Sequence, residues 1–187
     1  MTEKGFIITH KISINRASGQ ISNGVEIYIV GGGLLMENQF AEKAIRLWKK
    51  FGTHNIMVLA TGSDNRISSR QMSVIVYDGK FYCQTDETYL KYKQIAENPN
   101  VALSYKNFSI EGKCRIIGHP LDKDNSFFAD RFKKHFSHSY KAYTALPTER
   151  LLEITPTLVY SWEYRLLTPY MEHFDFENQA YRIEKMK

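Results

Sequence analysis

Hydrophobic and polar positions follow two different periods along this chain. Between Gln39 and Phe51, apolar residues recur every three or four positions, and lysine, arginine and glutamate fill the positions between them. This spacing predicts an amphipathic helix with one buried face, which Gly52 ends. Most later segments are short apolar runs or alternate with a period of two, which is typical of β-strands.

The predicted strands are joined by residues that favour turns. Asp78-Gly79 is a two-residue hairpin sequence between two of them, and Asp86 can cap a helix that Asn98-Pro99 ends. The predicted strands are Asn55 to Thr61, Ile67 to Tyr77, Lys80 to Gln84, Val101 to Tyr105, Ile110 to Ile117 and Leu151 to Glu163 (broken by Pro156), with a strand-rich tail from Pro169 to Lys187. The predicted later helices are Glu87 to Glu97 and Asp122 to Phe136. The sum predicts a mainly β fold with helices, a small antiparallel barrel rather than a doubly wound sheet.

Composition bounds the class of protein. The 187 residues are 43% hydrophobic and 13% aromatic, which is enough for one packed domain. The net charge of +5 favours an anionic ligand without requiring nucleic acid. Cys83 and Cys114 lie in apolar, strand-like runs, so we expect reduced thiols in a cytoplasmic protein.

The first 35 residues differ from the rest of the sequence. One hypothesis is that the natural protein begins at Met36, which makes residues 1–35 a leader or an added extension and residues 36–187 a single domain. The alternative is an N-terminal hairpin, because residues 24–30, "GVEIYIV", are a fair strand.

Several other function classes lack support in the sequence. No apolar run approaches the length of a membrane span, so we expect no membrane partner. His135 and His138 can share a helix face but have no further ligand at useful spacing, so we predict no metal site. The basic aromatic run from Arg131 to Lys141 is explained equally well by the wet face of a helix, and we expect no nucleic-acid partner. We predict no dedicated catalytic residue.

Basic and hydroxyl groups recur where the predicted strands end. Arg70 lies within one strand, Gln84 and Thr85 end the next, and Lys91 lies in the helix that follows. A strand that leads into a helix N-terminus is suited to bind an anion, and the planar guanidinium of Arg70 suits phosphate. The alternative is that these charges are simply solvated, and Asp86 adds a negative charge at the same helix start.

The order of these pieces resembles a known family. The segments "LAT", "DN", "SSRQMSVIVYDGKFYCQTDETYLKYKQIAENPNVALSY" and "EGKCRIIG", within residues 55–118, are similar to the pyridoxamine 5′-phosphate oxidase-like FMN-binding split barrels. The resemblance implies a six-stranded antiparallel split β-barrel. It also implies a homodimer with FMN in a groove between the subunits.

The resemblance assigns cofactor contacts residue by residue. The implied FMN-binding residues are Arg70, Gln71, Met72, Ser73, Gln84, Thr85, Lys91 and Lys113. Arg70 matches the arginine that begins the flavin-binding strand, and Lys91 matches the phosphate-binding lysine. Lys113 stands where the true oxidases carry a glutamine, and there it would place a positive charge near the flavin ring. The alternative for Lys113 is an outward-facing strand residue.

Departures from the family pattern indicate that the substrate-binding residues of the true oxidases are not retained. Ile75 stands where true oxidases have a lysine that serves the substrate phosphate. Tyr89-Leu90 replaces Ser-Arg before Lys91, and Phe174 lies near the position of a family tryptophan. We therefore expect a relative that is not itself a pyridoxamine phosphate oxidase.

Two function classes fit this reading. The first is an FMN-dependent oxidoreductase that acts on a small molecule, with an electron donor such as NAD(P)H. This class needs no acid or base from the protein, because the flavin carries the chemistry. The second is a non-catalytic flavin carrier, sensor or haem-binding protein of the same fold.

Overall fold

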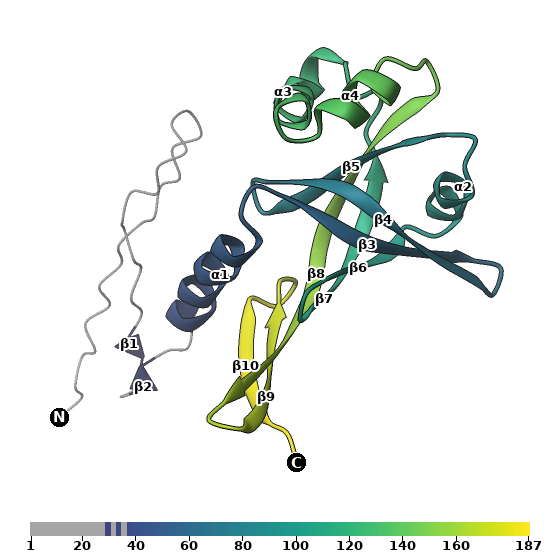
Figure 1. The fold of residues 1–187 in the computed structure, drawn as a ribbon. Helices are drawn as coiled ribbons and strands as arrows, with labels where there is room; N and C mark the ends of the chain where they lie inside the picture. Colours follow the sequence, from purple (N-terminus) through teal and green to yellow (C-terminus); the bar gives the residue numbers. More distant parts are fainter. Residues whose placement is uncertain (1–28, 31–32, 35–36) are drawn as a thin grey trace.

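A computed structural model describes residues 29–30, 33–34 and 37–187 (Figure 1). The helices are α1 (Glu37–Phe51), α2 (Leu90–Glu97), α3 (Ser126–His135) and α4 (Ser137–Tyr143), with a 3-10 turn at Lys123–Asn125. The strands are β1 (Ile29–Val30), β2 (Gly33–Leu34), β3 (His54–Ser63), β4 (Arg66–Tyr77), β5 (Lys80–Asp86), β6 (Asn100–Tyr105), β7 (Phe108–Ile116), β8 (Glu149–Arg165), β9 (Thr168–Asp175) and β10 (Ala180–Lys185). β1 pairs with β2. The other positions of the proposed extension, residues 1–35, lie outside the described residues.

Six strands form a closed antiparallel barrel. Their order is β8-β5-β4-β3-β6-β7, and pairing between β7 and β8 completes the ring. β9 and β10 continue the sheet beyond β8, as the ribbon at the bottom of Figure 1 shows. β8 is 17 residues long and pairs with three strands, β5, β7 and β9. The predicted six-stranded split barrel is therefore confirmed.

The sequence explains the two features that shape the barrel. Asp78 and Gly79 both adopt positive φ, 47° and 69°, which is the backbone that a two-residue hairpin between β4 and β5 needs. Along β7 buried and exposed residues alternate. Ile110 and Cys114 point into the barrel, and Glu111 points to solvent. This period of two is the predicted strand signal.

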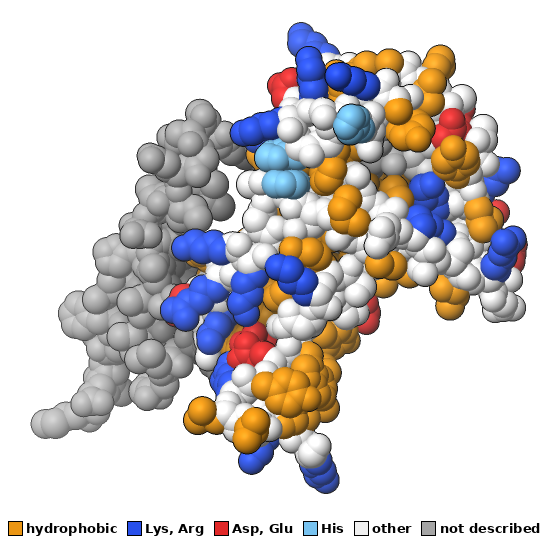
Figure 2. All heavy atoms as spheres, viewed as in Figure 1, with side chains coloured by type: hydrophobic (Ala, Val, Ile, Leu, Met, Phe, Trp, Pro, Cys, Tyr) orange, Lys and Arg blue, Asp and Glu red, His pale blue; other side chains and the backbone are white. Residues whose placement is uncertain are grey.

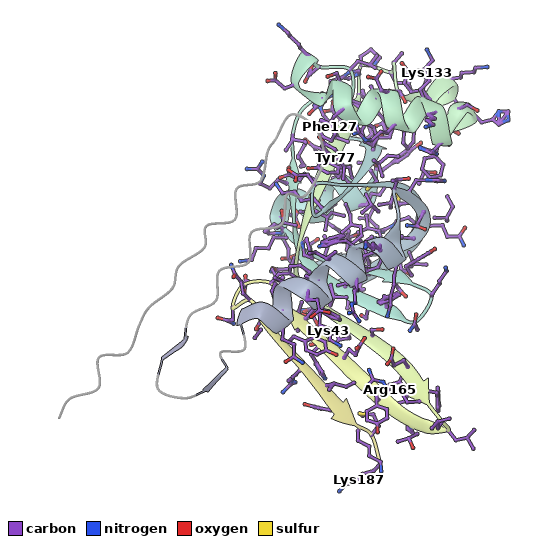
Figure 3. All side chains as sticks on the ribbon, turned by 90° about the vertical axis from the view of Figure 1, so that its left-hand side faces the viewer. Lys43, Tyr77, Phe127, Lys133, Arg165 and Lys187 are labelled. Carbon is purple, nitrogen blue, oxygen red and sulfur yellow. The ribbon has the colours of Figure 1, made fainter. Side chains whose placement is uncertain are left out.

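Helix α1 covers one side of the barrel core. Leu47 and Phe51 are buried on its inner face, and the Trp48 ring lies 5.3 Å from that of Phe81 in β5. Its lysine and arginine side chains gather on the outer face (Figure 2). In the view of Figure 3 the helix lies across the front of the barrel, and Lys43 is at its lower edge beside β10, where its ammonium lies 5.1 Å from the centre of the Tyr181 ring. The amphipathic helix predicted from the apolar spacing is confirmed.

A second apolar cluster lies outside the barrel wall, under α3. Phe128 and Phe132 of α3 pack against Ile75, Tyr82 and Leu151 from three adjacent strands. At the edge of this cluster Phe127 stacks on Tyr77 with ring centroids 5.1 Å apart (Figure 3). The aromatic residues of this helix therefore fix α3 to the barrel.

Two predicted boundaries were wrong. Helix α2 begins at Leu90 rather than Glu87, because the Asp86 carboxylate accepts bonds from Thr88 N–H and from the Thr88 and Thr148 hydroxyls. These bonds hold residues 86–88 in a turn. Helix α3 begins at Ser126 rather than Asp122, after the 3-10 turn. The strand β8 continues through Pro156, but its pairing with β7 shifts register there, since Pro156 pairs with Gly112 and Leu158 with Glu111. Pro156 lies between the stretch paired with β5 and the stretch paired with β9, where its missing N–H costs no ladder bond on that side.

Candidate functional site

A cavity of about 340 Å³ opens where β4 and β5 meet the start of α2. Helices α3 and α4, and the loop that follows α4, form its opposite wall. The lining residues are Gln71, Met72, Ser73, Gln84, Thr85, Asp86, Tyr89, Lys91, Phe132, Ser139, Tyr143, Leu146 and Glu149. Six of the eight residues predicted for the flavin site are in this set, and Arg70 and Lys113 are outside it.

Strand alternation explains why β4 contributes several predicted residues. Gln71 and Ser73 share a face with Ile75, since side chains two apart in a strand point the same way. Ile75 is buried beneath α3, whereas Gln71 is exposed. The cavity is therefore the open margin of the apolar cluster under α3, and Phe132 belongs to both.

Lys91 provides the positive charge of the cavity. It lies in the first turn of α2, and its ammonium lies 4.5 Å from the centre of the Tyr89 ring. Among the described residues that line the cavity, it is the one with a cationic side chain. Burial, and then the charge of Arg70, lower the pKa of Lys91 from its ordinary value. A negative charge bound there would favour the charged form of Lys91 and so offset both effects.

Arg70 lies next to this site, and its guanidinium bonds to residues of β3 and β4 at the end of the barrel. Its Nη1 donates to the Leu59 carbonyl at 3.1 Å and to Thr61 Oγ1 at 2.8 Å, and its Nη2 donates to Ser68 Oγ. Gln94 of α2 accepts from the hydroxyls of Thr61 and Ser68, at 2.7 and 2.8 Å. The guanidinium is thus fixed to α2 through two hydroxyl groups. Burial lowers its pKa.

The acidic residues at the start of α2 have their own partners. Asp86 accepts the turn bonds described above, and Glu87 forms an ion pair with Arg150, with 2.6 Å between Oε2 and Nη2. Hydrogen bonds from Thr148 and Thr88 lower the pKa of Asp86. Glu87 is therefore neutralised by its ion pair, whereas Asp86 is held in the turn and keeps its negative charge beside the cavity.

A buried carboxyl group forms the floor of the cavity. Glu149, the first residue of β8, is 4% exposed and pairs in register with Asp86. Burial, and then the charge of Asp86, raise its pKa to about 7, although Lys91 and a hydrogen bond with Gln84 act in the other direction. Gln84 is held in turn by the Thr144 hydroxyl, which donates to its Oε1 at 2.9 Å.

Lys113 lies apart from the cavity in the described chain. It projects from the outer face of β7 beside Asn100, and its side chain is 62% exposed. Its ammonium lies 3.7 Å from Oε1 of Glu177. Within one chain it is an outward-facing strand residue, which is the alternative given for it above.

A larger cavity, of about 540 Å³, lies at the turn between β3 and β4. Its lining includes Arg66, Asn98 and Glu111, and none of the eight predicted residues. The residues matched to the family therefore gather at the smaller cavity.

Three residues of the site were missed from the sequence. Gln94, Thr144 and Glu149 are all at most 4% exposed and hydrogen-bonded or charged. Gln94 had a weak signal, a polar residue on the buried side of a predicted helix. Glu149 and Thr144 had none, because their burial depends on how the loop after α4 returns to the barrel.

The comparisons decide the family. A family model described as pyridoxamine 5′-phosphate oxidase matches residues 42–163. The chain belongs to this family. The match runs from α1 through most of β8 and includes every strand of the closed barrel. A search of curated proteins found no match.

Solved structures share the fold at low sequence identity. A protein of unknown function from Agrobacterium tumefaciens is 16% identical, with a TM-score of 0.52, over 63% of this chain and 55% of that one. The haem storage protein HutZ from Vibrio cholerae is 10% identical, with a TM-score of 0.50, over 62% and 89%. A pyridoxamine 5′-phosphate oxidase-related, FMN-binding protein from Nostoc punctiforme is 15% identical, with a TM-score of 0.49, over 83% and 99%.

The described residues offer neither a membrane-spanning helix nor a cluster of metal ligands. No helix among them is long and apolar enough to cross a membrane. In the same part of the chain, no three or more His, Cys, Asp and Glu side chains are grouped so as to hold a metal ion.

Proposed function

We propose that this protein binds FMN in the cavity between β4, β5, α2 and α4, and uses it as the redox centre of a cytoplasmic oxidoreductase. The observation that carries the proposal is the gathering of six family-matched residues at one cavity beside Arg70. A volume of about 340 Å³ is within the range of small-molecule sites.

The donor set fits the phosphate end of FMN. Lys91 supplies a half-buried ammonium, and Thr85 supplies a hydroxyl at the end of β5. The first backbone N–H groups of α2 are nearby, and no acidic residue occupies its first turn. Arg70 adds a second positive charge close enough to lower the pKa of Lys91. Together these groups bind and orient a dianion.

The flavin ring would extend from the cavity across the outer face of the barrel. Ser73 and Gln71 stand opposite Ile56 and Val58 of β3, whose side chains are 50% and 37% exposed. A second copy of the chain covering this face would bury these apolar side chains and exclude water from the ring. We therefore propose a homodimer, and a partner's Lys113 is a candidate to approach the ring.

Bound FMN supplies hydride and one-electron transfer. The chain's part is to anchor the phosphate through Lys91, to keep Arg70 in place through Gln94, and to present one ring face to a small substrate. A donor such as NAD(P)H fits the same open face. Because Ile75 stands where the true oxidases have a lysine that serves the substrate phosphate, the proposed substrate is not pyridoxamine phosphate.

A second candidate is a non-catalytic flavin or haem carrier. The likeness to HutZ, a haem storage protein, favours keeping it. Absorbance spectra after addition of FMN or haem distinguish the two ligands. Reduction of bound FMN by NADH or NADPH distinguishes an enzyme from a carrier.

The binding site is tested by titrating FMN into the purified protein and four variants. Lys91→Ala should weaken binding by about ten- to a hundredfold, because a charge-assisted bond contributes about 1.5–3 kcal/mol. Lys93→Ala, which removes an exposed lysine from the same helix, is the matched control and should bind as wild type does. Equal losses in both variants would show a general charge effect and not a site.

Arg70 and Lys113 are expected to act differently. Arg70→Ala should weaken FMN binding more than Lys113→Ala does, because Arg70 lies beside the phosphate site and Lys113 is proposed to act on the ring. Loss of Lys113 should shift the reduction potential of bound FMN and leave the affinity close to wild type. Unchanged affinity in Arg70→Ala would show that β4 is wrongly aligned with the flavin strand.

A further inference from the structure

The cavity holds more negative charge than a phosphate site should. The charged side chains that line it are Lys91 from α2, Asp86 from β5 and Glu149 from β8. With all three ionised, the lining carries one positive and two negative charges. Arg70 lies behind the lining, and the Arg150–Glu87 pair outside it is internally neutral. The other titratable groups of the lining are the hydroxyls of Tyr89, before α2, and Tyr143, from α4, and the buried Cys83 thiol of β5 lies close enough to interact with Glu149.

The two carboxyl groups differ in how they can respond to a bound anion. Asp86 accepts bonds from Thr88 and Thr148, so these bonds keep it ionised. Glu149 is 4% exposed and faces the same Lys91. Its ionised form lacks such a set of donors, since Gln84 is the hydrogen-bond partner that acts on it. A dianion next to Lys91 therefore repels the ionised Glu149 carboxylate, which is shielded from water.

We propose that Glu149 determines when the cavity accepts a phosphorylated ligand, by taking up a proton as the phosphate binds beside Lys91. The inference rests on the proposed FMN site. With Glu149 neutral, Lys91 and Asp86 balance, and Arg70 leaves the site with a net positive charge. The protonated carboxyl can also donate a hydrogen bond to a phosphate or ribityl oxygen, which its ionised form cannot do.

The direction of the pH effect follows from linkage. The pKa of Glu149 in the free protein is raised to about 7 by burial and by Asp86. If the proton stays on in the complex, affinity falls by about tenfold between pH 6 and pH 8. The second ionisation of a phosphate monoester, with a pKa of about 6, acts the other way. It strengthens binding by at most about twofold over the same range, since about half of the ligand is already a dianion at pH 6.

The test is FMN titration at pH 6, 7 and 8 with wild type, Glu149→Gln and Glu97→Gln. Wild type and the exposed control Glu97→Gln should bind about five- to tenfold more weakly at pH 8 than at pH 6. Glu149→Gln should lose this dependence and bind as tightly at pH 8 as at pH 6, or up to about twofold more tightly. A pH dependence that persists in Glu149→Gln, or is missing from wild type, would overturn the inference.

A measurement on wild type alone covers the case in which Glu149→Gln does not fold. Calorimetric titration of FMN at pH 8, in two buffers with different ionisation enthalpies, should show uptake of close to one proton. FMN binding without proton uptake overturns the role of Glu149 and leaves the flavin site standing. Absence of FMN binding at every pH overturns the flavin site and, with it, this inference.

Discussion

Pairing between β7 and β8 closes the barrel, and Gly112 of β7 lies directly against the backbone of β8. A Cβ atom at this position would lie 2.6 Å from the Thr155 carbonyl oxygen and 3.2 Å from Ile154 Cγ2. The nearest atom belongs to backbone, so it cannot move aside as a flexible side chain would. Gly112→Ala must therefore push β8 away from β7 at the register shift between Glu111 and Gly112.

The magnitude follows from the kind of collision. Inserting a methyl group into a closely packed position costs about 1–3 kcal/mol. In a domain of this size, 1 kcal/mol shifts the melting temperature by about 2–4 °C, so Gly112→Ala should melt about 2–12 °C lower than wild type. The matched control is Gly62→Ala in β3. There the first contact is the Ile67 side chain at 3.3 Å, and Ile67 is 81% exposed and free to turn away.

Thermal unfolding of both variants, followed by far-ultraviolet circular dichroism, makes the comparison. Gly62→Ala should melt at or slightly above the wild-type temperature, because alanine restricts the unfolded chain. Gly112→Ala should melt below it. If Gly112→Ala melts within about 1 °C of wild type, β7 and β8 do not approach each other as described, and the closure of the barrel would have to be revised.

Two further predictions concern buried polar groups. Gln94→Ala should lower the free energy of unfolding by about 1–3 kcal/mol, since it leaves the Thr61 and Ser68 hydroxyls without their acceptor; urea denaturation measures this, and unchanged stability would contradict it. Burial raises the pKa of Glu153, but the bonds from Lys80 and Tyr82 and the charge of Arg115 outweigh it, and the pKa is lowered. The stability that Glu153 contributes is thus present above its unfolded pKa of about 4.5 and lost as the pH falls through the lowered folded value. Glu153→Gln should therefore be less stable by about 1 kcal/mol at pH 7 and should lose less stability than wild type between pH 6 and pH 3, by the same urea assay.

Local patterns predicted a small antiparallel barrel, and the resemblance to the family implied its six strands. The alternation in β7 and the Asp78-Gly79 turn each specify a strand or a hairpin from a few adjacent residues. The aromatic spacing in residues 122–136 predicted a helix, and its residues Phe128 and Phe132 are buried. These elements could be predicted because the residues of a single turn or strand determine its backbone conformation.

Contacts between distant segments were not readable in the same way. Glu149 becomes buried because the loop after α4 brings the start of β8 back beside β5. In the same region Thr144 bonds to Gln84, which lies 60 residues earlier in the chain. The helix α4 itself was missed as a separate element, since Phe136 interrupts the helical backbone between it and α3. The family resemblance predicted that Gln84, Thr85 and Lys91 lie near one another, but only the structure showed that the Glu149 carboxyl group lies beside them.

The triple pairing of β8 has a consequence for how the chain is made. The ribosome synthesises β3 to β7 before β8. Until β8 emerges, β5 and β7 each lack the neighbouring strand that β8 supplies. Unpaired strand margins of this kind can join to other nascent chains. Once residues 149–165 emerge, they close the ring through β5 and β7 and give β9 its template in the same event. Shortened chains that end before Glu149 would keep the strands and lose the barrel.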